Sequence, residues 1–183
     1  SQRISSLRSE GEIPIVAESI AGPLLGYVFD SEKNEFRSIL GIPGSSLLGS
    51  HLPVAFPVSR TWISPQQNYA LAETVDGGIV LIPFQDATIS ALPLQTSSGP
   101  GKRIAINSTG DSAIIWHESR RSLQQVDGLP SSPIVHEERD LSSLSGTVAA
   151  LAITDDKSLV LIGSGTQESA TLYSVEAGAE PHE

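Results

Sequence analysis

The segment WISPQQNYALA (residues 62–72) contains an apolar strand end, a small polar residue and a turn, followed by a second apolar strand. The same order returns in AINSTGDSAII (105–115) and again in AITDDKSLVL (152–161). The apolar runs are short and are separated by residues that favour turns, such as Gly, Asn and Asp, which is typical of β-hairpins. We therefore expect these segments to be equivalent hairpins of a repeated all-β unit.

The spacing of the repeat favours one architecture. Ile63, Ile106 and Ile153 occupy the same position in successive copies, 43 and 47 residues apart. A unit of roughly 40–50 residues with four strands has the length of one β-propeller blade. Apolar runs such as Ile79–Ile82 also suit strands that neighbouring blades cover on both faces. A β-sandwich, which also has a strand about every 8–12 residues, is the alternative fold.

We expect an all-β, β-propeller-like fold with about three to four blades of four antiparallel strands, forming part of a larger or associating propeller. The predicted division is an N-terminal extension at 1–19, blades within 20–177 (about 20–50, 54–97, 101–141 and 146–177) and a C-terminal tail at 178–183. The first block is expected to supply only its later strands, Leu24–Phe29 and Glu35–Gly41. Three alternatives follow: the terminal strands pair to close a four-bladed ring, the natural chain is longer, or copies associate through blade edges.

Composition excludes several classes of protein. Eleven basic and 21 acidic residues give a net charge of −10, which repels a nucleic-acid backbone. The longest apolar stretch, Val148–Ile153, is too short to span a bilayer. The sequence has neither Cys nor Met, so disulfides and Cys-based metal sites are excluded, and an extracellular or periplasmic location is favoured.

Two histidine motifs resemble the beginning of a zinc site. His117–Glu118 and His136–Glu137 both start like His-Glu-x-x-His, which needs a second His four residues after the first and a helix beneath it. Arg121 and Asp140 occupy the positions of that second His. We interpret both pairs as solvated strand ends.

Other polar segments also lack the residues that a site requires. Asp30–Asn34 begins like a calcium loop but lacks the Gly and the distal Glu, so we expect a hairpin turn there and at Asp155–Asp156. Ser98–Arg103 lacks the first Gly of a phosphate loop and is interpreted as an inter-blade linker. His51 is expected in a connection between blades and His182 in a frayed tail.

No nucleophile or cofactor motif completes a site either. Gly44–Leu48 does not form the Gly-x-Ser-x-Gly elbow of hydrolases, and Asn107–Thr109 matches a glycosylation sequon of a kind that is common by chance. Glu137–Asp140 is interpreted as a solvated acidic loop. We therefore predict no catalytic residue, no metal ligand and no cofactor. A site around a propeller channel would be built from strand ends of different blades and would escape local motifs.

Trp62 and Trp116 test the predicted register of the blades. Both are expected to pack between adjacent blades, where each indole N–H finds a backbone acceptor. The alternative is that one of them forms a ligand-stacking platform at the channel mouth.

Segments 63–72 and 106–115 resemble the strand–turn–strand core of WD-repeat-like and TolB-like propellers. In those proteins an apolar-Ser-Pro-Asp-Gly turn precedes a Leu-Ala-type strand. Here Pro65–Asn68 and Ser108–Asp111 replace the Asp-Gly, and the absence of a Trp-Asp dipeptide argues against a true WD-repeat protein. The segment 26–49 resembles uncharacterised secreted bacterial propeller-like proteins. The resemblance implies a fold and no particular activity.

The predicted function is that of a non-catalytic, secreted or periplasmic binding or scaffold module. We expect it to bind a protein partner or to self-associate through blade edges, without binding nucleic acid or spanning a membrane. One alternative is the partial propeller of a lactonase- or hydrolase-like enzyme with its site at the channel. The other is a structural subunit that assembles through strand edges.

Overall fold

The computed structural model describes residues 22–84, 89–165, 169–176 and 182. Within these ranges the chain forms four antiparallel β-sheets, here called blades 1 to 4, which confirms the all-β class. Blade 1 contains β1 (Leu24–Asp30), β2 (Glu35–Ile42) and β3 (Ser45–Pro53). Blade 2 contains β4 (Val58–Ile63), β5 (Tyr69–Thr74), β6 (Ile79–Pro83) and β7 (Leu92–Leu94). Blade 3 contains β8 (Lys102–Ile106), β9 (Ser112–His117), β10 (Ser122–Asp127), β11 (Ile134–Val135) and β12 (Arg139–Asp140). Blade 4 contains β13 (Thr147–Ile153), β14 (Leu159–Gly165) and β15 (Ala170–Glu176).

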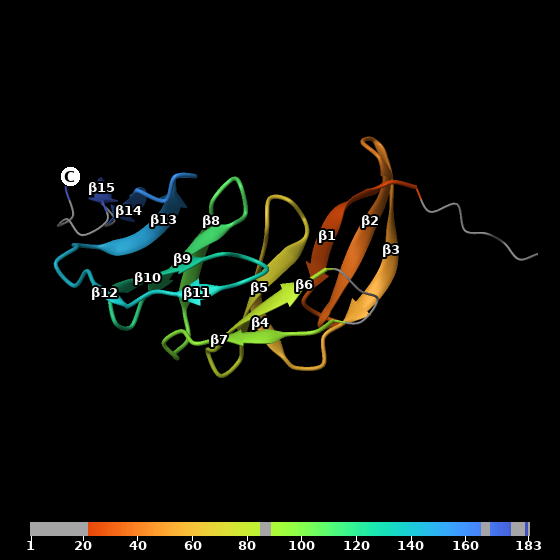
Figure 1. Cartoon of the computed structure of the whole chain (residues 1–183), viewed down its shortest axis with the longest axis horizontal. Helices are drawn as coiled ribbons and strands as arrows, with labels where there is room; N and C mark the ends of the chain where they lie inside the picture. The colour runs from red at the N-terminus through yellow and green to blue at the C-terminus, as the bar shows by residue number, and fades with distance from the viewer. Residues whose placement is uncertain (1–21, 85–88, 166–168, 177–181, 183) are drawn as a thin grey trace, which may run out of the picture.

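The blades follow one another along an open arc (Figure 1). The first strand of each blade lies beside the first strand of the next, so that β1, β4, β8 and β13 form its inner side. Blade 1 and blade 4 lie at opposite ends of the arc (Figure 1). The terminal blades therefore do not pair to close a four-bladed ring, which was one of the three alternatives.

The long apolar runs occur where a strand has a neighbour on each face. Successive side chains of a strand point to opposite faces of its sheet. Tyr69 and Leu71 of β5 accordingly pack in a cluster shared with blade 3, whereas Ala70 and Ala72 pack in a cluster shared with blade 1. This burial on both faces explains why β5 and β6 are almost continuously apolar, as the repeat predicted.

The three repeated hairpins have the same turn geometry. The small polar residue at the start of each turn accepts hydrogen bonds of 3.0–3.3 Å from backbone N–H groups across the turn. These residues are Ser64, Asn107 and Thr154. Three positions later, φ is positive in every copy, at 57° in Gln67, 72° in Gly110 and 65° in Lys157. The sequence alignment of the three segments is therefore also a structural alignment.

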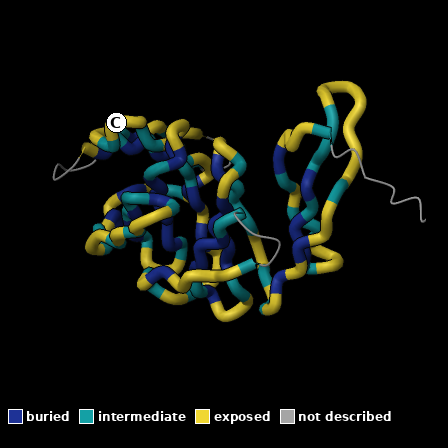
Figure 2. Tube along the Cα trace, turned by 45° about the vertical axis from the view of Figure 1, so that its right-hand side comes forward, coloured by how far each residue is buried: buried dark blue, intermediate teal, exposed yellow. Residues whose placement is uncertain are grey.

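Blade 1 differs from the expectation. The first block was expected to supply only two strands, but the turn after β2 is confined to Pro43 and Gly44, and a third strand, β3, begins directly afterwards. Because β1 lies beside β4, blade 1 supplies its first strands and not its later ones. The β3 strand is exposed along most of its length (Figure 2).

At the C-terminal end of the chain, His182 is more ordered than expected, and the last strand of blade 2 is short. The predicted extension at 1–19 lies outside the described residues. In the predicted tail only His182 is described, and its backbone exchanges hydrogen bonds of 2.7 and 2.9 Å with Ser174 of β15, so it is not frayed. The last strand of blade 2, β7, has only three residues. In the described part of the chain, no helix has the length and apolar character that crossing a membrane requires.

Candidate functional site

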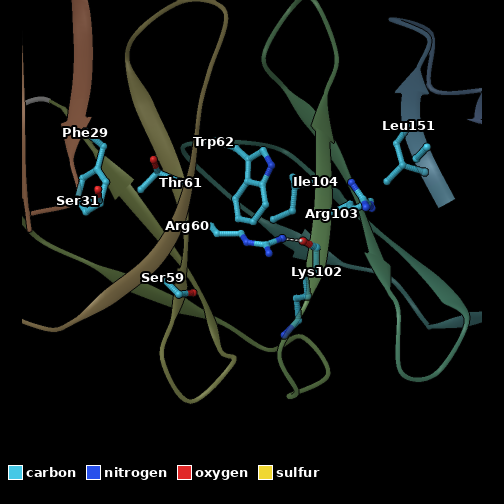
Figure 3. Close-up of a pocket in the computed structure, with 11 residues that line it drawn as sticks. Phe29, Ser31, Ser59, Arg60, Thr61, Trp62, Lys102, Arg103, Ile104 and Leu151 are labelled. Carbon is cyan, nitrogen blue, oxygen red and sulfur yellow. Dashed lines mark hydrogen bonds between the residues drawn. The ribbon is translucent and has the colours of Figure 1, made fainter. Parts of the chain in front are cut away.

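A cavity of about 450 Å³ opens on the inner side of the arc, where the first strands of the blades meet (Figure 3). All four blades contribute to it. Its lining consists of Phe29, Ser31, Ser59, Arg60, Thr61, Trp62, Lys102, Arg103, Ile104, Ala149 and Leu151. This channel pocket is the candidate site.

Two arginines give the channel pocket its charge. Arg60 and Arg103 are both exposed and lie at the same repeat position, two residues before the aligned Trp62 and Ala105. Arg60 extends from β4 toward β8, where its Nη1 donates to the Lys102 carbonyl oxygen at 3.4 Å (Figure 3). The Arg103 side chain lies on the side of β8 that faces Leu151 (Figure 3). Among the described residues, neither guanidinium has a carboxylate within ion-pair distance.

Trp62 supplies an aromatic wall to the same pocket. Its ring lies next to Ile104 (Figure 3) and packs against the cluster between blades 2 and 3, while part of it stays accessible. Within the described ranges its indole N–H finds no hydrogen-bond acceptor, in contrast to Trp116, whose Nε1 donates to Glu118 Oε2 at 2.8 Å. Trp62 therefore offers an apolar face and an unused donor.

Lys102 lines the pocket mainly through its backbone. Its side chain is fully buried and directed away from the pocket, and its ammonium donates to the carbonyl oxygens of Gly77 and Gly99 (Figure 3). Glu73 Oε1 lies 4.0 Å from this ammonium, and only 3% of the Glu73 side chain is exposed. Burial lowers the pKa of Lys102, and the Glu73 carboxylate opposes that shift. The lysine thus fastens the linker before β8 to blade 2.

The lining of the channel pocket combines hydrogen-bond donors with apolar side chains. The described lining residues comprise hydroxyl groups, two guanidinium groups and apolar side chains, without an Asp, Glu or His that would act as a general acid or base. Hydrogen-bond donors around an apolar floor suit an anionic or polar group attached to an apolar one.

The two histidine motifs are far from equivalent. His117 is only 3% exposed, so its interpretation as a solvated strand end is wrong; its Nε2 is buried without a hydrogen-bond partner. Burial lowers the pKa of its imidazole, and the Glu138 carboxylate opposes that shift. His136, by contrast, is half exposed and pairs with Asp127 Oδ2 at 2.7 Å. No group of three or more His, Asp or Glu side chains that could hold a metal ion occurs in the described ranges.

The acidic segment at 137–140 is more structured than expected. Glu138 accepts hydrogen bonds from Ser97 Oγ and Ser122 Oγ and lies 3.4 Å from Arg120 Nη1. Arg139–Asp140 forms β12, which pairs with the start of β10. The interpretation of a solvated loop is therefore wrong at Glu138, which instead joins the linker at Ser97 to blade 3.

Most of the remaining motifs lie in turns and linkers. Asp30–Asn34 and Asp155–Asp156 form hairpin turns, as expected. The Ser98–Arg103 segment is the linker into β8 together with the start of that strand. Asn107 is 1% exposed and its amide donates within its own turn, so the sequon is inaccessible in the folded chain. His51 lies within β3 and not in the expected connection between blades, and it pairs with Glu35 of β2 at 2.8 Å.

Both tryptophans pack between blades. Trp116 is completely buried in the cluster of blades 3 and 4, together with Leu141 and Tyr173. Its N–H partner is a carboxylate and not the expected backbone acceptor. Trp62 packs between blades 2 and 3 and also lines the channel pocket. Its position therefore also agrees with the alternative interpretation, in which one tryptophan is a ligand-stacking platform.

Sequence reasoning missed Arg60 and Arg103, because single charged residues within strands match no motif. The repeat itself contains the signal that would have found them. When residues 62–72 and 105–115 are aligned, the two arginines fall on the same position of adjacent inner strands.

The sequence matches no protein-family model and no curated protein. Several solved structures share the fold. A functionally unknown protein from Desulfotomaculum acetoxidans has a TM-score of 0.57 at 14% identity, over 84% of this chain and 51% of its own. A putative 6-phosphogluconolactonase from Bacteroides uniformis has a TM-score of 0.53 at 11% identity, over 91% of this chain and 55% of its own. The β-propeller domain of Cps50 (Swd1) from Myceliophteria thermophila has a TM-score of 0.52 at 12% identity, over 80% of this chain and 53% of its own.

These likenesses concern the fold alone, because every identity is low. The expected resemblance to β-propeller proteins is confirmed at that level. The chain spans about half the length of each of these solved structures. Its four sheets therefore have the arrangement of part of a β-propeller.

Proposed function

We propose that this chain is a non-catalytic β-propeller binding module that holds a protein partner at its channel pocket, in an extracellular or periplasmic setting. The observation that carries the proposal is the pairing of Arg60 and Arg103, without carboxylate partners in the described ranges, beside the accessible ring of Trp62. Unused donors and exposed aromatic surface are the features from which interface hot spots are built. The absence of Cys and Met from the sequence supports the proposed location.

The lactonase- or hydrolase-like alternative has less support. Such a reaction needs a group that transfers a proton or attacks the substrate, and the described lining residues offer only hydroxyl groups without a neighbouring base. The structural-subunit alternative concerns the ends of the arc and does not compete for the channel pocket.

The test uses a displayed library of random linear peptides, selected on the wild-type chain. Ala149→Trp fills the pocket from an exposed position of β13, and Ala152→Trp places the same side chain at an exposed position of that strand outside the pocket. We expect the selected peptides to lose at least about tenfold in affinity on Ala149→Trp and to keep wild-type affinity on Ala152→Trp, because a filled pocket excludes them. Peptides that bind both variants like the wild type would overturn the proposal.

A further inference from the structure

We propose that the channel pocket recognises an anionic side chain of a peptide, held by Arg60 and Arg103, with an apolar neighbour of that side chain against Trp62. The inference rests on the proposed function and specifies the chemistry of its ligand. A carboxylate of Asp or Glu and a phosphorylated side chain share that chemistry, and the experiment below separates the two sources.

The positions of the two arginines carry the first step. They stand on adjacent inner strands at the same repeat position, so their guanidinium groups flank the edge of β8 on either side (Figure 3). Guanidinium groups have donors arranged in a planar fork that matches a carboxylate or a phosphate oxygen pair. The single hydrogen bond of Arg60, at 3.4 Å to Lys102 O, leaves most of its donors free for a ligand.

Arg60 and Arg103 take no part in the ion pairs of the described chain. The buried charges beside them are already balanced, because Lys102 and Glu73 lie 4.0 Å apart. Elsewhere in the described chain, Arg120 and Lys157 have carboxylates at 3.4 and 2.8 Å, while Arg121 and Arg139 donate to backbone carbonyl oxygens, so that their donors are engaged within the fold. In a chain of net charge −10, with 21 acidic residues to choose from, two adjacent arginines without such a partner mark a local positive site.

Trp62 indicates what kind of group should lie beside the anionic side chain of the ligand. Its accessible face adjoins Ile104, and together they form an apolar surface next to the guanidinium groups (Figure 3). Its N–H, which no described residue accepts, adds one donor to the pocket. An anionic side chain followed or preceded by an apolar or aromatic residue would use all three features.

The short range of electrostatic interactions in salt solution favours a ligand with few charges over a polyanion. At physiological ionic strength the Debye length is about 8 Å, so a single anionic group in the pocket interacts mainly with the two arginines. A long polyanion would extend past them onto a protein surface that is negative overall. The pocket therefore suits one or two charges and disfavours a nucleic-acid strand.

The experiment uses an array of short peptides whose central residue is Glu, phosphoserine or Gln and whose flanking residues run through the common amino acids. We expect the best Glu or phosphoserine peptide to bind at least about tenfold more tightly than its Gln counterpart, because a charge-assisted hydrogen bond is lost in the amide. Arg60→Gln and Arg103→Gln should remove this preference. Arg139→Gln removes the same charge outside the pocket and should retain it.

The outcomes separate this inference from the proposed function. Peptides that require an open pocket, judged by Ala149→Trp, but bind equally with Glu and Gln would overturn the anionic ligand and leave the binding module in place. If Arg139→Gln lost the preference for an anionic central residue to the same extent, the proposed anionic ligand would also be overturned, since the net charge of the chain alone would then explain the preference. If no peptide is sensitive to Ala149→Trp, both fail. The preferred central residue, Glu or phosphoserine, identifies the source of the anion.

Discussion

At the scale of single residues, two of the three repeated turns have a side chain at the position of positive φ, where the third has Gly110. Gln67 and Lys157 have positive φ values of 57° and 65°, a conformation that costs a residue with a Cβ about 1 kcal/mol or more. Each of these side chains reaches the preceding blade, because Gln67 Oε1 accepts from Tyr27 N at 2.8 Å and Lys157 Nζ lies 2.8 Å from Asp111 Oδ2. The unfavourable backbone is therefore offset by contacts between blades.

Substitution of Gln67 separates these two contributions. Gln67→Ala loses the hydrogen bond to Tyr27 but keeps the backbone strain, and we expect it to lower the free energy of unfolding by about 1 kcal/mol. Gln67→Gly loses the same bond but relieves the strain, so it should be about 1 kcal/mol more stable than Gln67→Ala. Urea denaturation of the three proteins measures both differences. Identical midpoints for the Ala and Gly variants would contradict the argument.

His117 gives the fold a dependence on pH. Its pKa is lowered in the folded chain, chiefly by burial and also by Lys102 and Arg120, against the opposing effect of Glu138. The unfolded chain therefore binds more protons between the lowered folded pKa and about 6.5, and the free energy of unfolding falls as the pH drops through that window. The slope attributable to this residue is at most about 1.4 kcal/mol per pH unit.

Urea denaturation between neutral and mildly acidic pH measures this slope. His117→Gln should flatten it, whereas His136→Gln removes an exposed imidazole of the same blade and should leave the contribution of His117 in place. If both variants keep the slope of the wild type, another group accounts for the acid sensitivity.

At the scale of the elements, stability comes from the contacts between blades, and the two tryptophans differ in how far they contribute. Trp116 is completely buried between blades 3 and 4, so Trp116→Ala should cost about 3–5 kcal/mol of the free energy of unfolding. Trp62 keeps part of its ring in the channel pocket, and Trp62→Ala should cost only about 1–2 kcal/mol while abolishing peptide binding. Thermal and urea denaturation measure the costs, and a near-wild-type stability of Trp116→Ala would mean that this register of the blades is wrong.

The elements that the sequence predicted are those with a strong physical signal. Strands β5, β6 and β9 are apolar on both faces because two blades enclose them, and their turns contain Asn, Asp or Gly. Strand β3 was missed because its SSLLGSHLP sequence follows Pro43 and Gly44, is rich in Ser, and lies at the exposed edge of blade 1. Strand β12 has only two residues, both charged or polar, and depends on its pairing with β10. The pattern of apolar residues along a segment does not reveal strands that depend on pairing with a distant part of the chain.

The channel pocket is a property of the whole arc, which is why local motifs did not find it. Its lining residues come from four blades, so that Phe29 and Leu151 are more than a hundred residues apart in the sequence. The sequence predicted the fold that brings them together and placed Trp62 at its channel as an alternative. The repeat aligns the two arginines, and the structure adds that adjacent inner strands bring them to one cavity.

In the described part of the chain, the two end faces of the arc have no neighbouring blade. On blade 4, Tyr173 and Val175 point toward blade 3, so the alternating Leu172 points outward, and it is 60% exposed. On blade 1, Leu48 of β3 pairs with Ile39, on the face opposite to that of Phe36, which packs toward blade 2, and Leu48 is 54% exposed. Every inner boundary between blades buries such apolar side chains, and the ends of a stack of repeats are therefore prone to association.

We predict that the chain associates through these faces at increasing concentration. Leu172→Glu places a charge on the blade 4 face and should shift the equilibrium toward the monomer by about tenfold or more, because burial of an unpaired carboxylate is strongly unfavourable. Ile134→Glu is the matched control, since Ile134 is also 60% exposed but belongs to the outer edge of blade 3. Sedimentation velocity over a range of protein concentrations measures the effect. A wild-type chain that stays monomeric throughout, or an equal shift in Ile134→Glu, would show that the end faces do not drive association.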